Sequence, residues 1–210
     1  MKTRKIAYHI LGLAVAALLL YHSVYFTSLS EHKAMMAELV FDPTRAVEAF
    51  WKEAPAEMQE KALDLATFDR QLHENAQQLA QQQGNTLGIG APYSILIKGK
   101  AEVERVEDET AILRFDSDVT YVIRTGYIFS NTVREASGYF DLDRFETMMD
   151  FNLVALEINS RIVSTVIEPI KPQLVPGSTV EFLGAVDIDL RRIPTTSVEI
   201  IPVQLQCLQP

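Results

Sequence analysis

The chain has 210 residues, 48% of them hydrophobic, and its 28 acidic and 19 basic residues give a formal net charge of −9 at pH 7. Residues 1–26 contain three basic and no acidic residues, so the rest of the chain carries 16 basic and 28 acidic ones, a formal charge of −12. This excess of negative charge argues against nucleic acid as a partner, because phosphate backbones are repelled.

The first predicted element is a membrane anchor over residues 6–26. Lys2, Arg4 and Lys5 precede this uncharged stretch, which at 1.5 Å per helical residue can span a bilayer core of about 30 Å. Because positively charged flanks stay in the cytoplasm, residues 1–5 are expected to form a cytoplasmic tail. The chain is therefore predicted to cross the membrane once, with its C-terminal part outside the cytoplasm.

A cleaved signal peptide is the alternative interpretation of the same segment. The purely apolar stretch over residues 10–20 is short enough for a signal peptide, and Ser28-Leu29-Ser30 can serve as a cleavage site. Residues 24–26 extend the apolar run to the edge of that site, which favours an uncleaved anchor. No cysteine follows the run, so the sequence offers no thiol there for lipid attachment.

A helical membrane-proximal region is predicted over residues 27–84. Asp42 followed by Pro43 signals a helix start, because a carboxylate caps the first turn and proline fits its first position. Pro55 is expected to separate this helix from a second one that begins near Asp64. Apolar residues recur in the second helix at steps of three and four, up to a glutamine-rich end: Leu65, Phe68, Leu72, Ala76 and Leu79.

After a loop at residues 88–92, the hydrophobic period changes from helical to alternating. Strands are predicted over residues 93–98, 101–106, 110–115 and 119–124. A bulge at Gly99 is expected to join the first two into one long, bent strand, which leaves three strands.

Helical spacing returns over residues 143–168, with two apolar sides. The first side consists of Phe145, Met149, Leu153, Leu156 and Val163, and the second of Met148, Phe151, Ala155, Ile158, Ile162 and Val166. Two strands follow, over residues 180–190 and 198–205. Gly184 is expected at a bulge, and Pro202 marks the last strand as an edge strand.

Three strands, a helix and two strands is the element order of a five-stranded OB-type barrel. The predicted fold class is therefore α+β, with an N-terminal transmembrane helix, a helical stalk and an OB-like barrel domain over residues 85–210. The long helix lies between the third and fourth strands. We expect its first apolar side, which includes Leu156, to plug the bottom of the barrel.

A resemblance to a known family rests on the segment 126–136, Gly-Tyr-Ile-Phe-Ser-Asn-Thr-Val-Arg-Glu-Ala, and on Phe145 and Leu156-Glu-Ile-Asn159. These residues resemble bacterial predicted periplasmic lipoproteins that are catalogued only as a domain of unknown function. Members commonly show Gly-Thr-x-x-Arg-Asp-Ala, then Phe-x-Asn-Gln opening a helix that later carries Leu-Asn. This chain departs from the pattern at Asn131, Glu135, Thr147 and Met148, and it lacks the lipid-bearing cysteine.

The resemblance covers nearly the whole exported part and implies a periplasmic protein. Together with the predicted anchor, it implies a single-pass protein of the bacterial inner membrane with its C-terminal domain in the periplasm. Relatives are encoded beside sugar-uptake transporters of the ATP-binding-cassette (ABC) type. The partners that this implies are ABC transporter components or a sugar-binding protein.

Side chains suited to catalysis are scarce in the predicted barrel. All four histidines, at positions 9, 22, 32 and 73, precede it, which excludes a histidine-based metal site or a Ser-His-Asp arrangement built within it. Gly88-Ile-Gly90 lacks the third glycine of a dinucleotide fingerprint and precedes a strand, so we interpret it as a flexible loop. Asp187 and Asp189 can share one face of a strand, where paired carboxylates bind Ca²⁺, but such pairs more commonly face water. No cofactor and no metal site are expected.

The polar residues that best fit a binding site are Thr132, Arg134 and Glu135. In an extended segment, Thr132 and Arg134 share one side, and a guanidinium can bind a carboxylate, a phosphate or sugar hydroxyls through two hydrogen bonds. The alternative is an ion pair of Arg134 with an acid that fixes this segment to the long helix. Asn159 on that helix is equally open to a binding or a structural role.

The sequence therefore favours a non-catalytic, membrane-anchored accessory protein that contacts a partner protein or a small polar ligand. A solute- or oligosaccharide-binding protein is the alternative. A carboxylate-dependent hydrolase is a weaker one, because it needs two acids that converge in a cleft.

Overall fold

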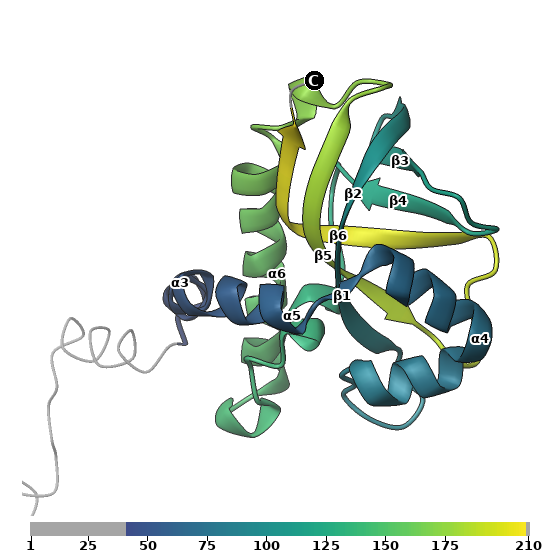
Figure 1. Cartoon of the computed structure of the whole chain (residues 1–210). Coiled ribbons are helices and arrows are strands. Elements are labelled where there is room, and N and C mark those ends of the chain that lie inside the picture. Colours follow the sequence, from purple (N-terminus) through teal and green to yellow (C-terminus); the bar gives the residue numbers. More distant parts are fainter. Residues whose placement is uncertain (1–40, 209–210) are drawn as a thin grey trace, which may run out of the picture. The chain divides into compact units, whose positions relative to one another are not determined.

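Five strands close into a barrel in the part of the chain that the computed structural model describes, residues 41–208 (Figure 1). A two-residue strand, β1 (Leu63–Asp64), adds a sixth member to the sheet by pairing parallel to β2. The barrel strands are β2 (Tyr93–Glu107), β3 (Thr110–Arg114), β4 (Thr120–Arg124), β5 (Thr179–Ile188) and β6 (Ser197–Leu208). The predicted anchor and cytoplasmic tail lie outside the described residues.

The order of the strands is that of an OB-type barrel. Neighbouring strands follow the order β2, β3, β4, β6, β5, and the pairing of β5 with β2 closes the ring. The β4–β6 pair is parallel, and the other pairs within the ring are antiparallel. Closure leaves few exposed strand edges. The predicted α+β class with an OB-like barrel is confirmed.

β2 is one continuous strand, as predicted, but Gly99 is not its bulge. The irregularity lies between Val103 and Arg105, where β2 pairs with β3. Gly99 pairs with Phe182 of β5, and a Cβ atom at Gly99 would lie 3.0 Å from the Cβ of Leu65. The glycine therefore serves close packing against α4 (Leu65–Gln83) rather than a change of register.

Pro202 does not mark an edge strand, because β6 pairs with strands on both sides. Residues 197–200 pair with β4, and residues 201–208 pair with β5. The register shifts at Gly184, as predicted, and Pro202 is its partner there. A bulge tolerates the missing N–H of proline within a paired strand, which is the physical reason for this correction.

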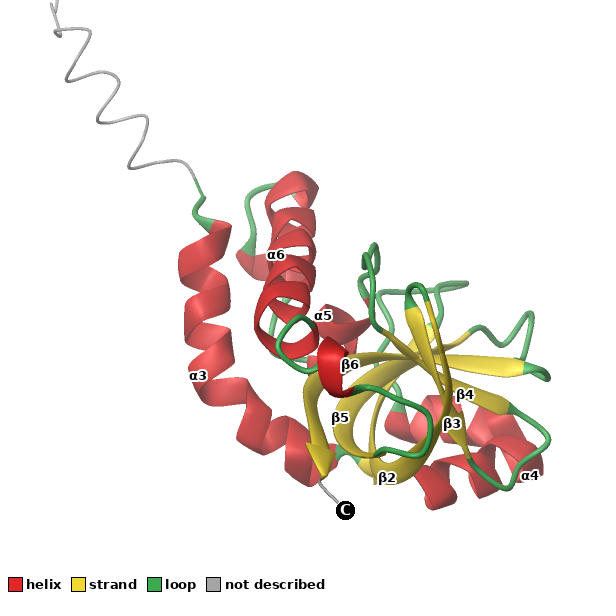
Figure 2. Cartoon of the chain, turned by 90° about the horizontal axis from the view of Figure 1, so that it is seen from above, coloured by secondary structure: helices red, strands yellow, loops and turns green. Residues whose placement is uncertain are grey.

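Two long helices precede the barrel and pack on it, so their described part is a layer of the domain rather than a free stalk (Figure 2). α3 (Pro43–Lys61) packs against α6 (Met148–Arg161), and α4 packs against β2. Asp42 caps α3 by accepting hydrogen bonds from the backbone of Thr44 and Arg45, as predicted. Pro55 does not end α3, which continues through it because the buried side chains of Ala54 and Met58 hold both flanks against the domain.

No helix within residues 41–208 combines the length and the apolar character needed to cross a bilayer. The remaining helical segments are short. They are α5 (Thr132–Ser137), 3₁₀ turns at Leu142–Arg144 and Lys171–Gln173, and a π-helical turn at Ile162–Ile167 that continues α6.

The second apolar side of α6 faces the domain, and the first does not. Phe151 and Ile158 are fully buried, whereas Leu156 is 46% exposed and Met149 is more exposed still. The prediction that the first side plugs the barrel is therefore wrong. Since both sides carry apolar residues, spacing alone does not decide which one the neighbouring α3 and barrel cover.

Asp69 fastens α4 to the barrel. Its carboxylate accepts hydrogen bonds from Ser117 Oγ at 2.5 Å and from Tyr121 Oη at 2.8 Å. Burial, together with the hydrogen bond to Asp69, raises the pKa of Tyr121 above its usual range. The phenol thus remains a donor at any physiological pH.

We expect Asp69→Ala to lower the free energy of unfolding by about 2–4 kcal/mol, because two hydrogen bonds to a charged group disappear and a buried phenol loses its acceptor. Chemical denaturation measures the change. Asp64→Ala is the matched control, because Asp64 is an exposed residue that makes no side-chain hydrogen bond at the start of α4. Equal and small decreases in the free energy of unfolding of the two variants would contradict a stabilising role for the hydrogen bonds of Asp69.

Candidate functional site

The segment 131–137 folds as a short helix rather than the extended stretch that the sequence analysis considered. α5 begins after Asn131 and ends at Gly138, which adopts a left-handed conformation with φ of 62°. Thr132 and Arg134 consequently do not share a face as they would in a strand. The side-chain amide of Asn85 donates to the carbonyl oxygens of Glu135 and Ala136 and fixes the end of the helix.

Arg134 is buried, with 2% of its surface exposed. Its guanidinium carbon lies 3.6 Å from the centre of the Phe151 ring, and Nη1 donates to the Phe151 carbonyl oxygen at 2.6 Å. Nε donates to the Glu135 carboxylate at 2.9 Å. The guanidinium therefore joins α5 to α6 through the Phe151 carbonyl oxygen, whereas its ion pair with Glu135 lies within α5 and not between the two helices.

Glu135 is the anionic partner in this ion pair, and its carboxylate loses part of its hydration because the side chain is mostly buried. Burial raises the pKa of Glu135 and nearby Asp187 adds to the rise, whereas the hydrogen bond from Arg134 opposes it. The carboxylate is thus committed to Arg134 rather than free to meet a ligand.

Thr132 and Asn159 extend the same buried network. The hydroxyl of Thr132 donates to Asp187 at 2.7 Å, and Ser94 donates to the other oxygen of that carboxylate. The amide of Asn159 donates to the carbonyl oxygen of Ser130 at 2.7 Å. All four predicted site residues lie on α5 and α6, and two of them, Thr132 and Asn159, bond to Ser130 in the loop that precedes α5.

That loop forms one wall of a small hollow, here called the asparagine groove. Its volume is about 240 Å³, and it is lined by Phe129, Ser130, Asn131, Asn152, Ala155, Leu156 and Asn159. Phe129 is 80% exposed, and Leu156 faces it from α6. Of the four predicted residues, only Asn159 lines this groove.

The asparagine groove continues into an uncharged stripe along α6. Met149, Asn152, Leu156 and Ser160 are exposed and recur at steps of three and four, so they share one helix face. Sequence reasoning identified the apolar members of this stripe but assigned them to the core. Phe129 was not named as a site residue, although it lies within the segment 126–136 that carries the family resemblance.

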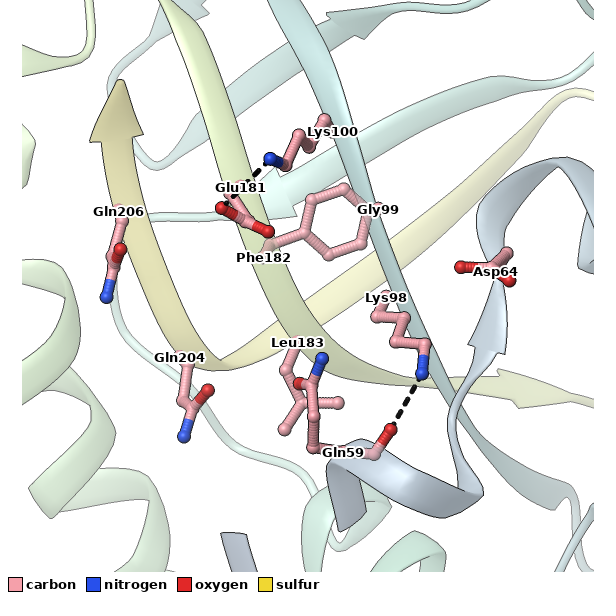
Figure 3. Close-up of a pocket in the computed structure, with 10 residues that line it drawn as sticks. All are labelled: Gln59, Asp64, Lys98, Gly99, Lys100, Glu181, Phe182, Leu183, Gln204 and Gln206. Atoms are coloured by element: carbon pink, nitrogen blue, oxygen red, sulfur yellow. Dashed lines mark hydrogen bonds and ion pairs between the residues drawn. The ribbon is translucent and has the colours of Figure 1, made fainter. Parts of the chain in front are cut away.

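A second and larger hollow, here called the outer groove, lies on the outer face of β2, β5 and β6 (Figure 3). Its volume is about 580 Å³, and Leu183 and Phe182 lie among ten lining residues that are mostly polar. Lys98 donates to the backbone oxygen of Gln59 at 2.8 Å, and Lys100 lies 3.4 Å from Glu181. The remaining polar residues are Asp64, Gln204 and Gln206. The sequence analysis named none of the ten as a binding residue.

The aspartate pairs do not converge on a common site. Asp187 bonds to Ser94 and Thr132, whereas Asp189 lies beyond the end of β5 and bonds to Arg191 at 2.8 Å. These hydrogen bonds lower the pKa of Asp189 to about 2. Within residues 41–208, no three His, Cys, Asp or Glu side chains are arranged to hold a metal ion.

Comparison with solved structures gives the class of protein. An OB-fold protein from Thermotoga maritima matches with a TM-score of 0.73 and 24% sequence identity, over 80% of this chain and 99% of that one. The S. pombe Stn1–Ten1 complex matches with a TM-score of 0.23 and 11% identity, over 55% of this chain and 59% of that one. The chain is an OB-fold protein with added helices.

Comparison with family models then identifies the family. Residues 14–206 match the model described as "Predicted periplasmic lipoprotein (DUF2291)", so the chain belongs to this family of unknown function. The resemblance noted in segment 126–136 is thereby confirmed. No curated protein matches the chain.

Proposed function

We propose that this chain is a non-catalytic accessory protein of the periplasm, held at the inner membrane by residues 6–26. It docks a partner protein through the asparagine groove and the stripe on α6. The partner is a component of an ABC transporter for sugar uptake or the sugar-binding protein that serves it. The observation that carries this proposal is an uncharged groove with the exposed Phe129 among its lining residues, whose two walls are joined by the hydrogen bond from Asn159 to the Ser130 carbonyl oxygen.

The dimensions of the groove favour a protein over a small ligand. Pockets for small molecules usually measure about 300–1,000 Å³ and enclose most of the ligand, whereas the asparagine groove is smaller and open. Exposed Phe and Met side chains are typical of the anchors of protein interfaces. The stripe is free of charge on a chain with many acidic residues, so the partner surface is expected to be apolar.

We expect Phe129→Ala to abolish co-purification of the transporter components with the intact, detergent-extracted chain. The variant should unfold within about 0.5 kcal/mol of the unaltered protein, because Phe129 is exposed. Val175→Ala removes a side chain from another exposed position and should leave capture unchanged. Full capture by the Phe129 variant would exclude the groove as the docking surface.

The outer groove supports the second candidate function, a solute- or oligosaccharide-binding protein. Its volume is in the range of small-molecule sites, and its two lysines, two acids and three glutamines offer donors and acceptors without a net charge. Titration of the intact protein with neutral oligosaccharides tests this function. Loss of binding in Gln204→Ala, with Phe129→Ala unaffected, would separate it from partner docking. A carboxylate-dependent hydrolase has less support, because Asp187 and Asp189 bond to different partners.

A further inference from the structure

Two loops with exposed apolar side chains lie together at one end of the barrel. The apolar loop, residues 84–92, leads into β2, and the arginine loop, residues 189–196, follows β5. Tyr93 pairs with Ile188, so the two loops leave the sheet at neighbouring positions. A Cβ atom at Gly90 would lie 3.8 Å from a guanidinium nitrogen of Arg191, which places the two loops side by side.

The apolar loop has a composition that is unusual for an exposed segment of an acidic protein. Residues 85–97 contain no charged residue, and Leu87 and Ile89 extend into solvent, with Ile89 fully exposed. Gly90 has φ of 83°, a conformation that side chains with a Cβ rarely adopt, and it turns the chain sharply after Ile89. The loop therefore projects an apolar tip that the domain itself does not cover.

The arginine loop supplies cations next to this tip. Arg191 is paired with Asp189, whereas Arg192 is exposed and its guanidinium makes no hydrogen bond or ion pair with a described residue. Ile193, which follows, is also exposed. The acidic turn at Asp116 and Asp118 borders this loop, since Thr120 donates to the Thr196 carbonyl oxygen. The apolar side chains, rather than net charge, must therefore dominate any contact made here.

We propose that these two loops form a membrane-contact surface, with Leu87, Ile89 and Ile193 in the interfacial layer and Arg192 at the phosphates of the lipid headgroups. Burial of apolar tips beside a cation is the chemistry of interfacial membrane binding. The expected anchor over residues 6–26 would hold the domain near the bilayer. Residues 27–41 can extend by about 50 Å, which keeps the domain within reach of the bilayer. The acidic remainder of the domain is repelled by anionic lipid, which turns the loops toward the membrane.

The test uses the full chain, with Cys207→Ser, reconstituted into vesicles of equal parts phosphatidylcholine and phosphatidylglycerol. In an Ile89→Cys variant, an environment-sensitive dye should show a blue-shifted emission that lipids with brominated acyl chains quench. The matched control is Val175→Cys, which precedes the opposite end of β5 and should report water. Arg192→Glu should reduce the quenching at position 89 in these vesicles but not in pure phosphatidylcholine.

Identical, unquenched spectra at positions 89 and 175 would overturn the proposal, as would protection of position 89 only after a partner protein is added. Recovery of the chain in the vesicle fraction is measured separately, because a failed anchor would leave the chain outside the vesicles. The docking proposal for the asparagine groove is independent of this result.

Discussion

Arg134→Ala should lower the free energy of unfolding by about 3–5 kcal/mol, because it empties the buried site of the guanidinium and leaves the partly buried Glu135 carboxylate without its cation. It also removes the hydrogen bond to the Phe151 carbonyl oxygen and the stacking on the Phe151 ring. Chemical denaturation followed by circular dichroism measures this change.

Two variants make the result specific to the buried ion pair. Arg144→Ala removes an exposed arginine from the neighbouring 3₁₀ turn and should change stability by less than about 0.5 kcal/mol. Arg134→Lys keeps the positive charge but lacks the planar guanidinium with its parallel N–H donors. It should therefore restore only part of the lost free energy of unfolding. A stable Arg134→Ala variant that no longer captures its partner would instead assign Arg134 to the binding surface.

Ile158→Ala should cost about 2–5 kcal/mol, because Ile158 is fully buried between α6 and the rest of the domain. The matched control is Leu156→Ala on the same helix, whose side chain is nearly half exposed and whose truncation should cost less than about 1 kcal/mol. The two variants remove similar apolar volumes two residues apart.

Thermal or chemical unfolding of both variants distinguishes the two sides of α6. A larger loss for Leu156→Ala than for Ile158→Ala would mean that α6 packs through its first apolar side. In that case the stripe would belong to the core, and the proposed docking surface would lose its helix wall.

The barrel could be predicted from the sequence because its strands alternate cleanly and their order around one helix fits few folds. The burial of α6 could not be predicted, since apolar residues such as Met149 and Phe151 occur on both of its sides. Pro55 and Pro202 misled the analysis for a related reason. Each breaks a local rule that packing by neighbouring elements overrides in the folded chain.

The contacts of the predicted site residues could not be predicted from the sequence. Arg134 and Glu135 are adjacent in sequence, and the pattern alone does not reveal that they lie in a short helix that buries Arg134. A binding role for Thr132, Arg134, Glu135 and Asn159 stays a prediction.

The closure of the barrel has a consequence for the way the chain reaches its fold. β2 pairs with β5 along ten residues, and the two strands are separated by β3, β4, α5 and α6 in the sequence. The longest pairing in the sheet therefore forms only after a large loop has been closed, which slows folding in proteins dominated by such distant contacts. Before β5 pairs with β2 during folding, one long edge of β2 is unpaired and can pair with other chains. α4, which packs on β2 from nearby in the sequence, is in a position to cover that strand first.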